Sequence, residues 1–192
     1  MDELLRISLL EGQARAMLVK SAALVEEARK IHDLSRTATA ALGRLLTGTA
    51  MLGAMLKSPT DSVTVSIRGN GPMGRLLSVG APDGTVKGYV EHPEVDPERR
   101  NGKLNVGGAV GKGRLSVVRD LGMREPYVGQ VELVNGEIAM DFTYYFATSE
   151  QQPTLLSLGV LMPDAAHSAE LGVLSAGGLL IQPLPECSEE LL

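Results

Sequence analysis

The sequence has few of the residues that form metal or disulfide sites. Its 192 residues include one cysteine, Cys187, and no CxC or CxxC pair. One thiol cannot form an internal disulfide or a four-thiolate metal site. The three histidines stand at positions 32, 92 and 167, and none lies in an HxH, HExxH or HxxxH spacing. The residues therefore give poor support to a zinc site, and we expect no metal ligands in this chain.

The sequence also lacks an excess of positive charge and a long uninterrupted apolar run. The formal net charge is -5 and the pI is near 5.3, which argues against nucleic acid as a partner. The N-terminus has no basic region followed by an apolar run, so we expect a cytoplasmic protein. Residues 38–56 carry one charge, Arg44, but glycines and threonines dilute their hydrophobicity. A buried helix is favoured over a membrane span, and we expect no membrane partner.

What is present is the composition of a globular domain, with 44% hydrophobic and 21% charged residues. A chain of this size should bury roughly 70% of its unfolded surface in one core. The pattern predicts an α+β fold, a single domain of antiparallel β-sheets packed with segregated helices. The expected strands are 4–10, 13–20, 63–67, 75–79, 85–90, 104–106, 115–119, 127–134, 155–162 and 171–181, and the expected helices are 21–32, 37–56 and 136–152.

The helices and the longest loop have different predicted environments. Ser21 is expected to cap the first helix, with Leu24, Ala28 and Ile31 packed on a sheet. The second helix is expected to be central and buried. The third should bury one face, formed by Ile138, Phe142, Tyr145 and Phe146. The loop at 91–103 contains two prolines and seven charged residues, and is expected to be exposed and mobile.

No motif forms a persuasive catalytic centre. Residues 69–74 are GNGPMG and fit the GxGxxG fingerprint, but Pro72 sits inside the loop and a strand is expected to follow it. A glycine-rich hairpin is favoured, and a nucleotide-binding enzyme using this loop is the alternative. No GxSxG motif occurs. Asp120 suits a turn, Glu132 a solvent-facing strand position and Glu137 a helix N-terminus, so we expect no enzyme.

Several strands carry apolar residues on both faces, as in Val117-Val118 and Leu155-Leu156. One explanation is a sheet covered on both sides by the chain's own helices, and the residues alone favour it. The other is a sheet with one face left open as a contact surface.

Four segments are idiosyncratic enough to suggest a family. They are RGNGPMGRLLSV at 68–79, DGTVKGYVEHP at 83–93, AVGKGRLSVVRDLGMREPYVGQVELVNGEIAMDFTYYFATSEQQP at 109–153 and AGGLLIQPLP at 176–185. Together they closely resemble the bacterial 33 kDa heat-shock chaperonin, a redox-regulated holdase chaperone. The resemblance spans nearly the whole chain.

The resemblance implies an ATP-independent, cytoplasmic, dimeric chaperone that binds unfolding or oxidatively damaged client proteins and prevents their aggregation. It also implies a core domain, here 1–182, then a linker, of which 183–192 would be the start. The linker leads in this family to a small zinc domain with CxC and CxxC ligands. Neither motif occurs in this sequence, so no residue inherits a zinc-ligand role and we expect no cofactor in this chain.

The family core is thought to present an apolar face that the linker covers in the inactive state. We place this client-binding face on the strands at 115–134. The candidate residues are Val117, Leu121, Met123, Tyr127, Val131 and Leu133.

Overall fold

The computed structural model describes residues 2–164, 172–185 and 187. The strands are β1 (Glu3–Leu9), β2 (Ala14–Lys20), β3 (Ser62–Gly69), β4 (Arg75–Gly80), β5 (Val86–Val90), β6 (Gly113–Asp120), β7 (Tyr127–Glu132), β8 (Leu155–Leu161) and β9 (Ser175–Pro183). The helices are α1 (Ala22–His32), α2 (Arg36–Ala54), α3 (Val106–Val110) and α4 (Ala139–Thr148), with a short 3-10 turn, η1, at Leu10–Gly12.

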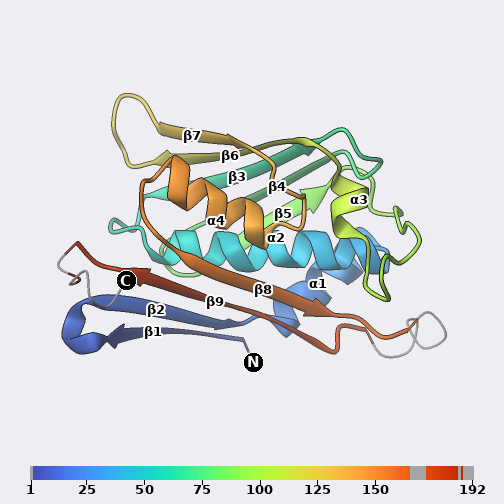
Figure 1. Ribbon diagram of the computed structural model, residues 1–192, viewed down its shortest axis with the longest axis horizontal. Coiled ribbons are helices and arrows are strands. Elements are labelled where there is room, and N and C mark those ends of the chain that lie inside the picture. The colour runs from blue at the N-terminus through green and yellow to red at the C-terminus, as the bar shows by residue number, and fades with distance from the viewer. Residues whose placement is uncertain (1, 165–171, 186, 188–192) are drawn as a thin grey trace.

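The strands form two antiparallel sheets with α2 between them. One sheet has five strands in the order β5-β4-β3-β6-β7, and the other has four in the order β1-β2-β9-β8. Helix α2 contacts β3, β4 and β5 on one side and β2, β8 and β9 on the other. Figure 1 shows this sheet–helix–sheet arrangement, with α4 beside α2 in the same layer. The α+β expectation is confirmed.

Helix α2 is almost completely enclosed. Seventeen of its 19 residues are buried, which confirms the expected central helix at 37–56 with a C-terminal end two residues earlier. Within the described part of the chain, no helix is long and apolar enough to cross a membrane. The glycines of α2 allow neighbouring side chains to approach closely. A Cβ on Gly43 would lie 2.6 Å from the Val25 side chain, and one on Gly48 would lie 2.6 Å from the Phe142 ring.

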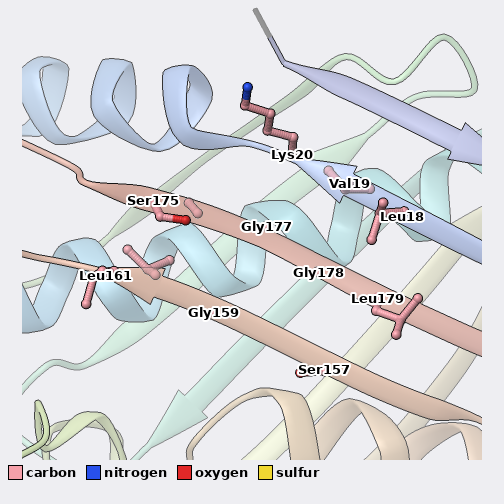
Figure 2. A pocket seen from close by; sticks show the side chains of 12 residues that line it. Leu18, Val19, Lys20, Ser157, Gly159, Leu161, Ser175, Gly177, Gly178 and Leu179 are labelled. Carbon is pink, nitrogen blue, oxygen red and sulfur yellow. The ribbon is translucent and has the colours of Figure 1, made fainter.

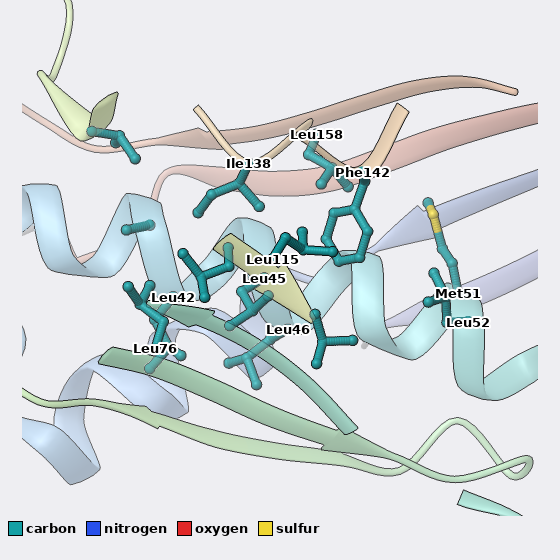
Figure 3. Packing of buried hydrophobic residues seen from close by; sticks show 14 of the residues in the cluster. Leu42, Leu45, Leu46, Met51, Leu52, Leu76, Leu115, Ile138, Phe142 and Leu158 are labelled. Atoms are coloured by element: carbon teal, nitrogen blue, oxygen red, sulfur yellow. The ribbon is translucent and has the colours of Figure 1, made fainter. Parts of the chain in front are cut away.

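The core gathers around this helix from both sheets and from α4. Leu42, Leu45 and Leu46 of α2 belong to one cluster with side chains of the five-stranded sheet, of α4 and of the four-stranded sheet. Figure 3 shows Leu76 and Leu115 from the first, Ile138 and Phe142 near α4, and Leu158 from the second. The predicted face of α4 is confirmed, since Ile138, Phe142, Tyr145 and Phe146 are all buried.

The charge inside the buried helix is paired. Arg44 Nη1 donates to Glu137 Oε2 at 2.7 Å, and Glu137 Oε1 accepts from Gly107 N at 3.0 Å. Glu137 therefore serves α2 and α3 rather than the N-terminus of α4, where the sequence placed it. This pairing provides the carboxylate partner that a guanidinium in a largely apolar layer requires.

Helix α1 differs from its expected packing. It contacts mainly α2, with Val25 and Ala28 buried, while Ile31 is 68% exposed. Ser21 is the N-cap residue but makes no capping bond with its side chain. Its hydroxyl lies 2.7 Å from that of Thr47 instead, because both groups are buried and each needs a hydrogen-bond partner.

One predicted strand is wrong, and several element boundaries also differ from expectation. The predicted strand at 104–106 is wrong: Asn105 accepts a hydrogen bond from Gly108 N and caps α3, which starts at Val106. Strand β7 ends at Glu132 rather than 134, and α4 begins at Ala139 rather than 136. Strand β9 begins at Ser175 rather than 171. The expected turn around His167 lies outside the described residues.

Asp141 explains the shifted boundaries between β7 and α4. Its buried carboxylate accepts hydrogen bonds from four backbone N–H groups, those of Val134 (2.7 Å), Asn135 (3.2 Å), Gly136 (3.3 Å) and Ile138 (2.8 Å). These groups would otherwise have no strand or helix partner. One carboxylate therefore organises the whole turn that leads into α4.

Replacing Asp141 by Ala is expected to lower the free energy of unfolding by about 3 kcal/mol, because four partly or fully buried N–H groups lose their acceptor. Urea unfolding followed by circular dichroism measures this change. Asp120→Ala is the matched control, since exposed Asp120 accepts one bond, from Gly122 N, and should change stability by less than about 0.5 kcal/mol. Similar effects of the two substitutions would contradict the assigned role of Asp141.

Glu26 ties α1 to the segment that enters β9. It accepts hydrogen bonds from Arg29 Nη2 at 2.7 Å and from Val173 N at 2.9 Å, and it lies 3.5 Å from Lys30 Nζ. The Arg29 hydrogen bonds are the main cause that lowers the pKa of Glu26 to about 2, against an opposing contribution from partial burial. The expected Glu26/Lys30 pair is present, with Arg29 as the stronger partner.

The folded-state pKa of Glu26 is below its unfolded value, so the ionised carboxylate stabilises the fold above about pH 4.3 and loses this contribution as pH falls toward 2. We expect Glu26→Gln to destabilise the protein at pH 7 and to approach the parent stability near pH 2. Urea unfolding at several pH values measures the difference. Glu132→Gln, at an exposed ion pair, should show almost no pH-dependent difference.

Candidate functional site

The outer face of the four-stranded sheet is an exposed apolar surface. One row across the sheet contains Leu5, Leu18, Leu179 and Ser157, and the next contains Ile7, Ala16, Ile181 and Leu155. These positions alternate with the core residues Met17, Val19, Leu180, Leu156 and Leu158 on the same strands. Because side chains of a strand alternate between faces, the rows point away from α2. We call this surface the outer face.

Most apolar side chains of the outer face are open to solvent, whereas Ala16 is buried. The exposed fractions of Leu5, Ile7, Leu18, Leu155 and Leu161 are between 42% and 57%. With strands about 4.8 Å apart and a rise of about 3.3 Å per residue, the face covers about 300 Å² in projection. That area reaches the size of the largest apolar patches on typical monomers, which are often functional. Within the described chain, α1, α2 and α4 all lie on the other side of this sheet (Figure 1).

A depression of about 600 Å³ lies on the outer face, over β2, β9 and β8. Figure 2 shows Gly159, Gly177 and Gly178 in its middle, Leu161 at one end, and Leu18 and Leu179 at the other. A Cβ on Gly159 would meet no atom within 4 Å, whereas one on Gly177 would lie 2.5 Å from the Val19 carbonyl oxygen. The glycines therefore keep an apolar floor open between leucine walls.

The outer face has the chemistry of a binding surface rather than of a catalytic one. Lys20 is the one charged residue that lines the depression, and the other lining residues are apolar, glycine or serine. Such a surface removes apolar side chains of a partner from water and gives little directional selectivity. It suits a partner that exposes apolar side chains.

The six predicted client-contact residues do not form one face. Leu121 and Met123 are exposed in the loop between β6 and β7, at 40% and 66%. Tyr127 opens β7, where its hydroxyl donates to the Ser149 carbonyl oxygen at 3.4 Å and its ring lies 6.0 Å from the Arg119 guanidinium carbon. These three residues lie together at one end of the five-stranded sheet.

The other three predicted residues face the core. Val117 is fully buried in β6, and Val131 and Leu133 are half-buried against the same cluster. They alternate with outward-facing Val118 and Val128, so they are packed on the helix layer. None of the six belongs to the outer face of the four-stranded sheet. The paired apolar positions Leu155-Leu156 carried the signal for that face, but the partner strands could not be identified from the sequence.

The glycine loop at 69–74 is an internal packing element. The backbone N–H groups of Asn70, Gly71 and Met73 donate to carbonyl oxygens of Lys112, Val110 and Ala109, at 2.8 to 3.0 Å. A Cβ on Gly71 would collide with the Ala109 carbonyl, and Met73 is fully buried. Strand β4, not a helix, follows at Arg75. The loop thus lacks the free N–H groups and the helix N-terminus that a dinucleotide fingerprint uses.

Comparison with known proteins assigns the chain to a family. A family model described as Hsp33 protein matches residues 2–192. The chain belongs to the Hsp33 family. Its α+β fold agrees with the crystal structure of the 33 kDa chaperonin from Thermotoga maritima, to which it is similar with a TM-score of 0.88 and 42% identity over 96% of this chain and 62% of that one.

Two further relatives of this Hsp33-family chain show the same extent of similarity. The 33 kDa chaperonin of Clostridioides difficile is 48% identical over 98% of this chain and 64% of that protein. The 33 kDa chaperonin of Alkaliphilus metalliredigens is 46% identical over 100% of this chain and 64% of that protein. The chain therefore spans less than two thirds of the length of these relatives.

The residues present do not fit the four-cysteine zinc site that the family resemblance implies. Cys187 is the one cysteine of the sequence. In residues 2–164, 172–185 and 187, no group of three or more His, Cys, Asp or Glu side chains could hold a metal ion. No zinc-dependent step is therefore assigned to this Hsp33-family chain.

The outer face should tolerate a charge that the core does not. Leu161→Lys is expected to change the free energy of unfolding by less than about 1 kcal/mol, because Leu161 is 57% exposed. Val117→Lys should cost several kcal/mol, since it buries an unpaired charge. Urea unfolding measures both, and binding of a hydrophobic dye should fall in the folded Leu161 variant. Strong destabilisation by Leu161→Lys would show that this face is covered.

Proposed function

We propose that the chain is the client-binding core of an ATP-independent holdase chaperone. Membership of the Hsp33 family and the 33 kDa chaperonin relatives support a chaperone role. The observation that carries the mechanism is the open apolar outer face of the four-stranded sheet. Unfolding proteins expose apolar side chains that normally lie in their cores, and these are the groups that such a face binds.

The size of the outer face suits holding rather than tight binding. If all of the roughly 300 Å² on each partner were apolar, its removal from water would contribute at most roughly 15 kcal/mol at about 25 cal/mol per Å². Association and ordering of the client cost a comparable amount, roughly 4 to 15 kcal/mol. The net affinity is therefore modest, so a client segment can leave when its protein refolds. Aggregation is suppressed because the same client surface is not available to a second unfolded chain.

Other properties belong to the proposal through the family resemblance. Residues 1–182 would act as the core domain, and a segment of the whole protein beyond it would cover the outer face until it is displaced. Clients would be unfolding or oxidatively damaged proteins in the cytoplasm, bound by a homodimer. Redox control would depend on zinc ligands that this chain does not contain. The chain by itself is therefore proposed to hold clients without oxidation.

Gly159→Lys tests the proposed function at the centre of the depression. The added side chain enters open space, so the fold should be kept, while its charge should reduce suppression of client aggregation at least tenfold in effective concentration. Light scattering of a heat-unfolding client protein without ATP measures suppression, and far-UV circular dichroism checks the fold. Unchanged suppression by a folded Gly159→Lys protein would exclude the outer face as the client site.

Two matched variants complete this test. Gln130→Lys adds the same charge at an exposed position of β7, on the other sheet, and should suppress aggregation as the parent does. Met123→Lys changes the exposed loop between β6 and β7 that the sequence favoured as part of the client face. We expect it to keep most activity. If Met123→Lys reduced the suppression of aggregation and Gly159→Lys did not, the client site would lie at that loop.

A further inference from the structure

Four cationic side chains gather where α2 ends, on the side of the four-stranded sheet opposite the outer face. Two cavities, of about 470 Å³ and about 600 Å³, share Arg15, Met55, Leu56 and Lys57 in their walls. The first is also lined by Arg119, and the second by Arg6. We call the two cavities together the Arg15 trough. In a chain with a net charge of -5, such a concentration of positive charge is unusual.

The carboxylates near the trough are already engaged. Glu150 Oε2 accepts a hydrogen bond from Arg119 Nη1 at 2.8 Å, and its Oε1 accepts a hydrogen bond from the Tyr145 hydroxyl. Asp61 is nearly buried and accepts from Ser58 N at 3.0 Å. Both line the first cavity, and the second has no carboxylate in its described wall. The positive charge of Arg15 is therefore not neutralised within the described part of the chain.

Arg15 is fixed in position, and among the described residues it has no carboxylate partner. Its Nε and Nη2 atoms donate to Gln182 Oε1 at 2.9 Å and 2.7 Å, and Nη2 lies 3.8 Å from the Met55 sulfur. Gln182 is 1% exposed, and its own amide nitrogen donates to Thr154 Oγ1 at 2.7 Å. Partial burial, followed by repulsion from Arg119 and Arg6, lowers the pKa of Arg15. A bound anion would form charge-assisted hydrogen bonds with this pre-oriented, partly buried guanidinium and would offset the repulsion from the other arginines.

Apolar side chains form much of the remaining trough wall, beside the polar Gln152, Gln182 and Ser8. Met55 and Leu56 line both cavities, Leu121 and Phe146 line the first, and Leu184 lines the second. A free inorganic anion would leave these side chains without contacts. A carboxylate carried between apolar side chains would use both the guanidinium and the walls.

The cations have one structural role that does not require a ligand. The trough lies at the C-terminal end of α2, where the helix dipole favours positive charge. However, the side-chain donors of Arg15 go to Gln182 and to the Met55 sulfur rather than to the last carbonyl groups of α2. The helix end accounts for positive charge in this region, but it leaves the orientation of Arg15 toward the cavities unexplained.

We infer that the Arg15 trough binds a peptide segment of another protein chain in which a carboxylate side chain is flanked by apolar residues. Arg15 would pair with the carboxylate, Lys57 would add attraction from the rim, and Met55, Leu56 and Leu121 would contact the flanking side chains. This contact is separate from the outer face and does not depend on holdase activity. If clients use both, the protein would favour unfolded segments that combine acidic and apolar residues.

Isothermal titration with two acetylated, amidated peptides, GSLELSG and GSLQLSG, tests the inference on the full chain. The glutamate peptide should bind about tenfold more tightly, which corresponds to about 1.4 kcal/mol. Arg15→Gln should remove this preference, and Arg114→Gln, at an exposed ion pair on the other sheet, should keep it. Equal binding of both peptides to the parent protein, or a preference that survives in Arg15→Gln, would overturn the inference.

A second variant covers the case in which Arg15→Gln does not fold. Lys57 is exposed and takes no part in the Gln182 hydrogen bonds, so Lys57→Gln should fold and reduce the preference about threefold. If folded Lys57→Gln kept the full preference for the glutamate peptide, the trough would not be the binding site. Because the titration involves no client aggregation, its outcome is independent of the light-scattering test of the outer face.

Discussion

The enclosure of α2 between two sheets is the constraint on which the rest of the structure depends. Helix α2 contacts the inner faces of both sheets, so most of its residues are small or apolar, and its Arg44 is paired with Glu137. Gly43 and Gly48 permit neighbouring elements to approach where a larger residue would separate them. Since the helices of the described residues lie in this middle layer or at its edge, none of them covers the far face of either sheet (Figure 1). The open surface is a direct result of how the core is built.

The two ends of α2 have different surroundings. At its N-terminus, Asp96 accepts from Thr37 N at 3.2 Å and from Arg36 Nη2 at 2.8 Å, and Ser35 Oγ donates to the Val95 carbonyl at 2.6 Å. The loop at 91–103, expected to be mobile, is thus fastened to the helix. At the C-terminus, the Arg15 trough opens, and Lys57 and Asp61 from the segment that follows α2 line its first cavity. Negative charge at one end and positive charge at the other both match the helix dipole.

Sequence patterns predicted the elements that local periodicity defines and missed those that depend on distant partners. Helix α2 and the buried face of α4 follow from spacing within one segment. The outer face requires β2 to pair with β9, which joins Leu18 to Leu179 across most of the chain. No local pattern reveals that pairing. Val117 lies on a strand with apolar residues on both faces, and only the position of the helix layer shows which of Val117 and Val118 is buried.

Strand β2 shows how one short sequence can serve three purposes. Leu18 faces outward onto the apolar surface, while Met17 and Val19 face α2 and enter the core. Arg15 has the same inward orientation as Met17 but lies where α2 has already ended, so it meets cavities instead of a helix. A guanidinium there avoids the desolvation that full burial would impose. The length of α2 relative to β2 therefore decides where the core stops and where charge can be placed beneath the sheet.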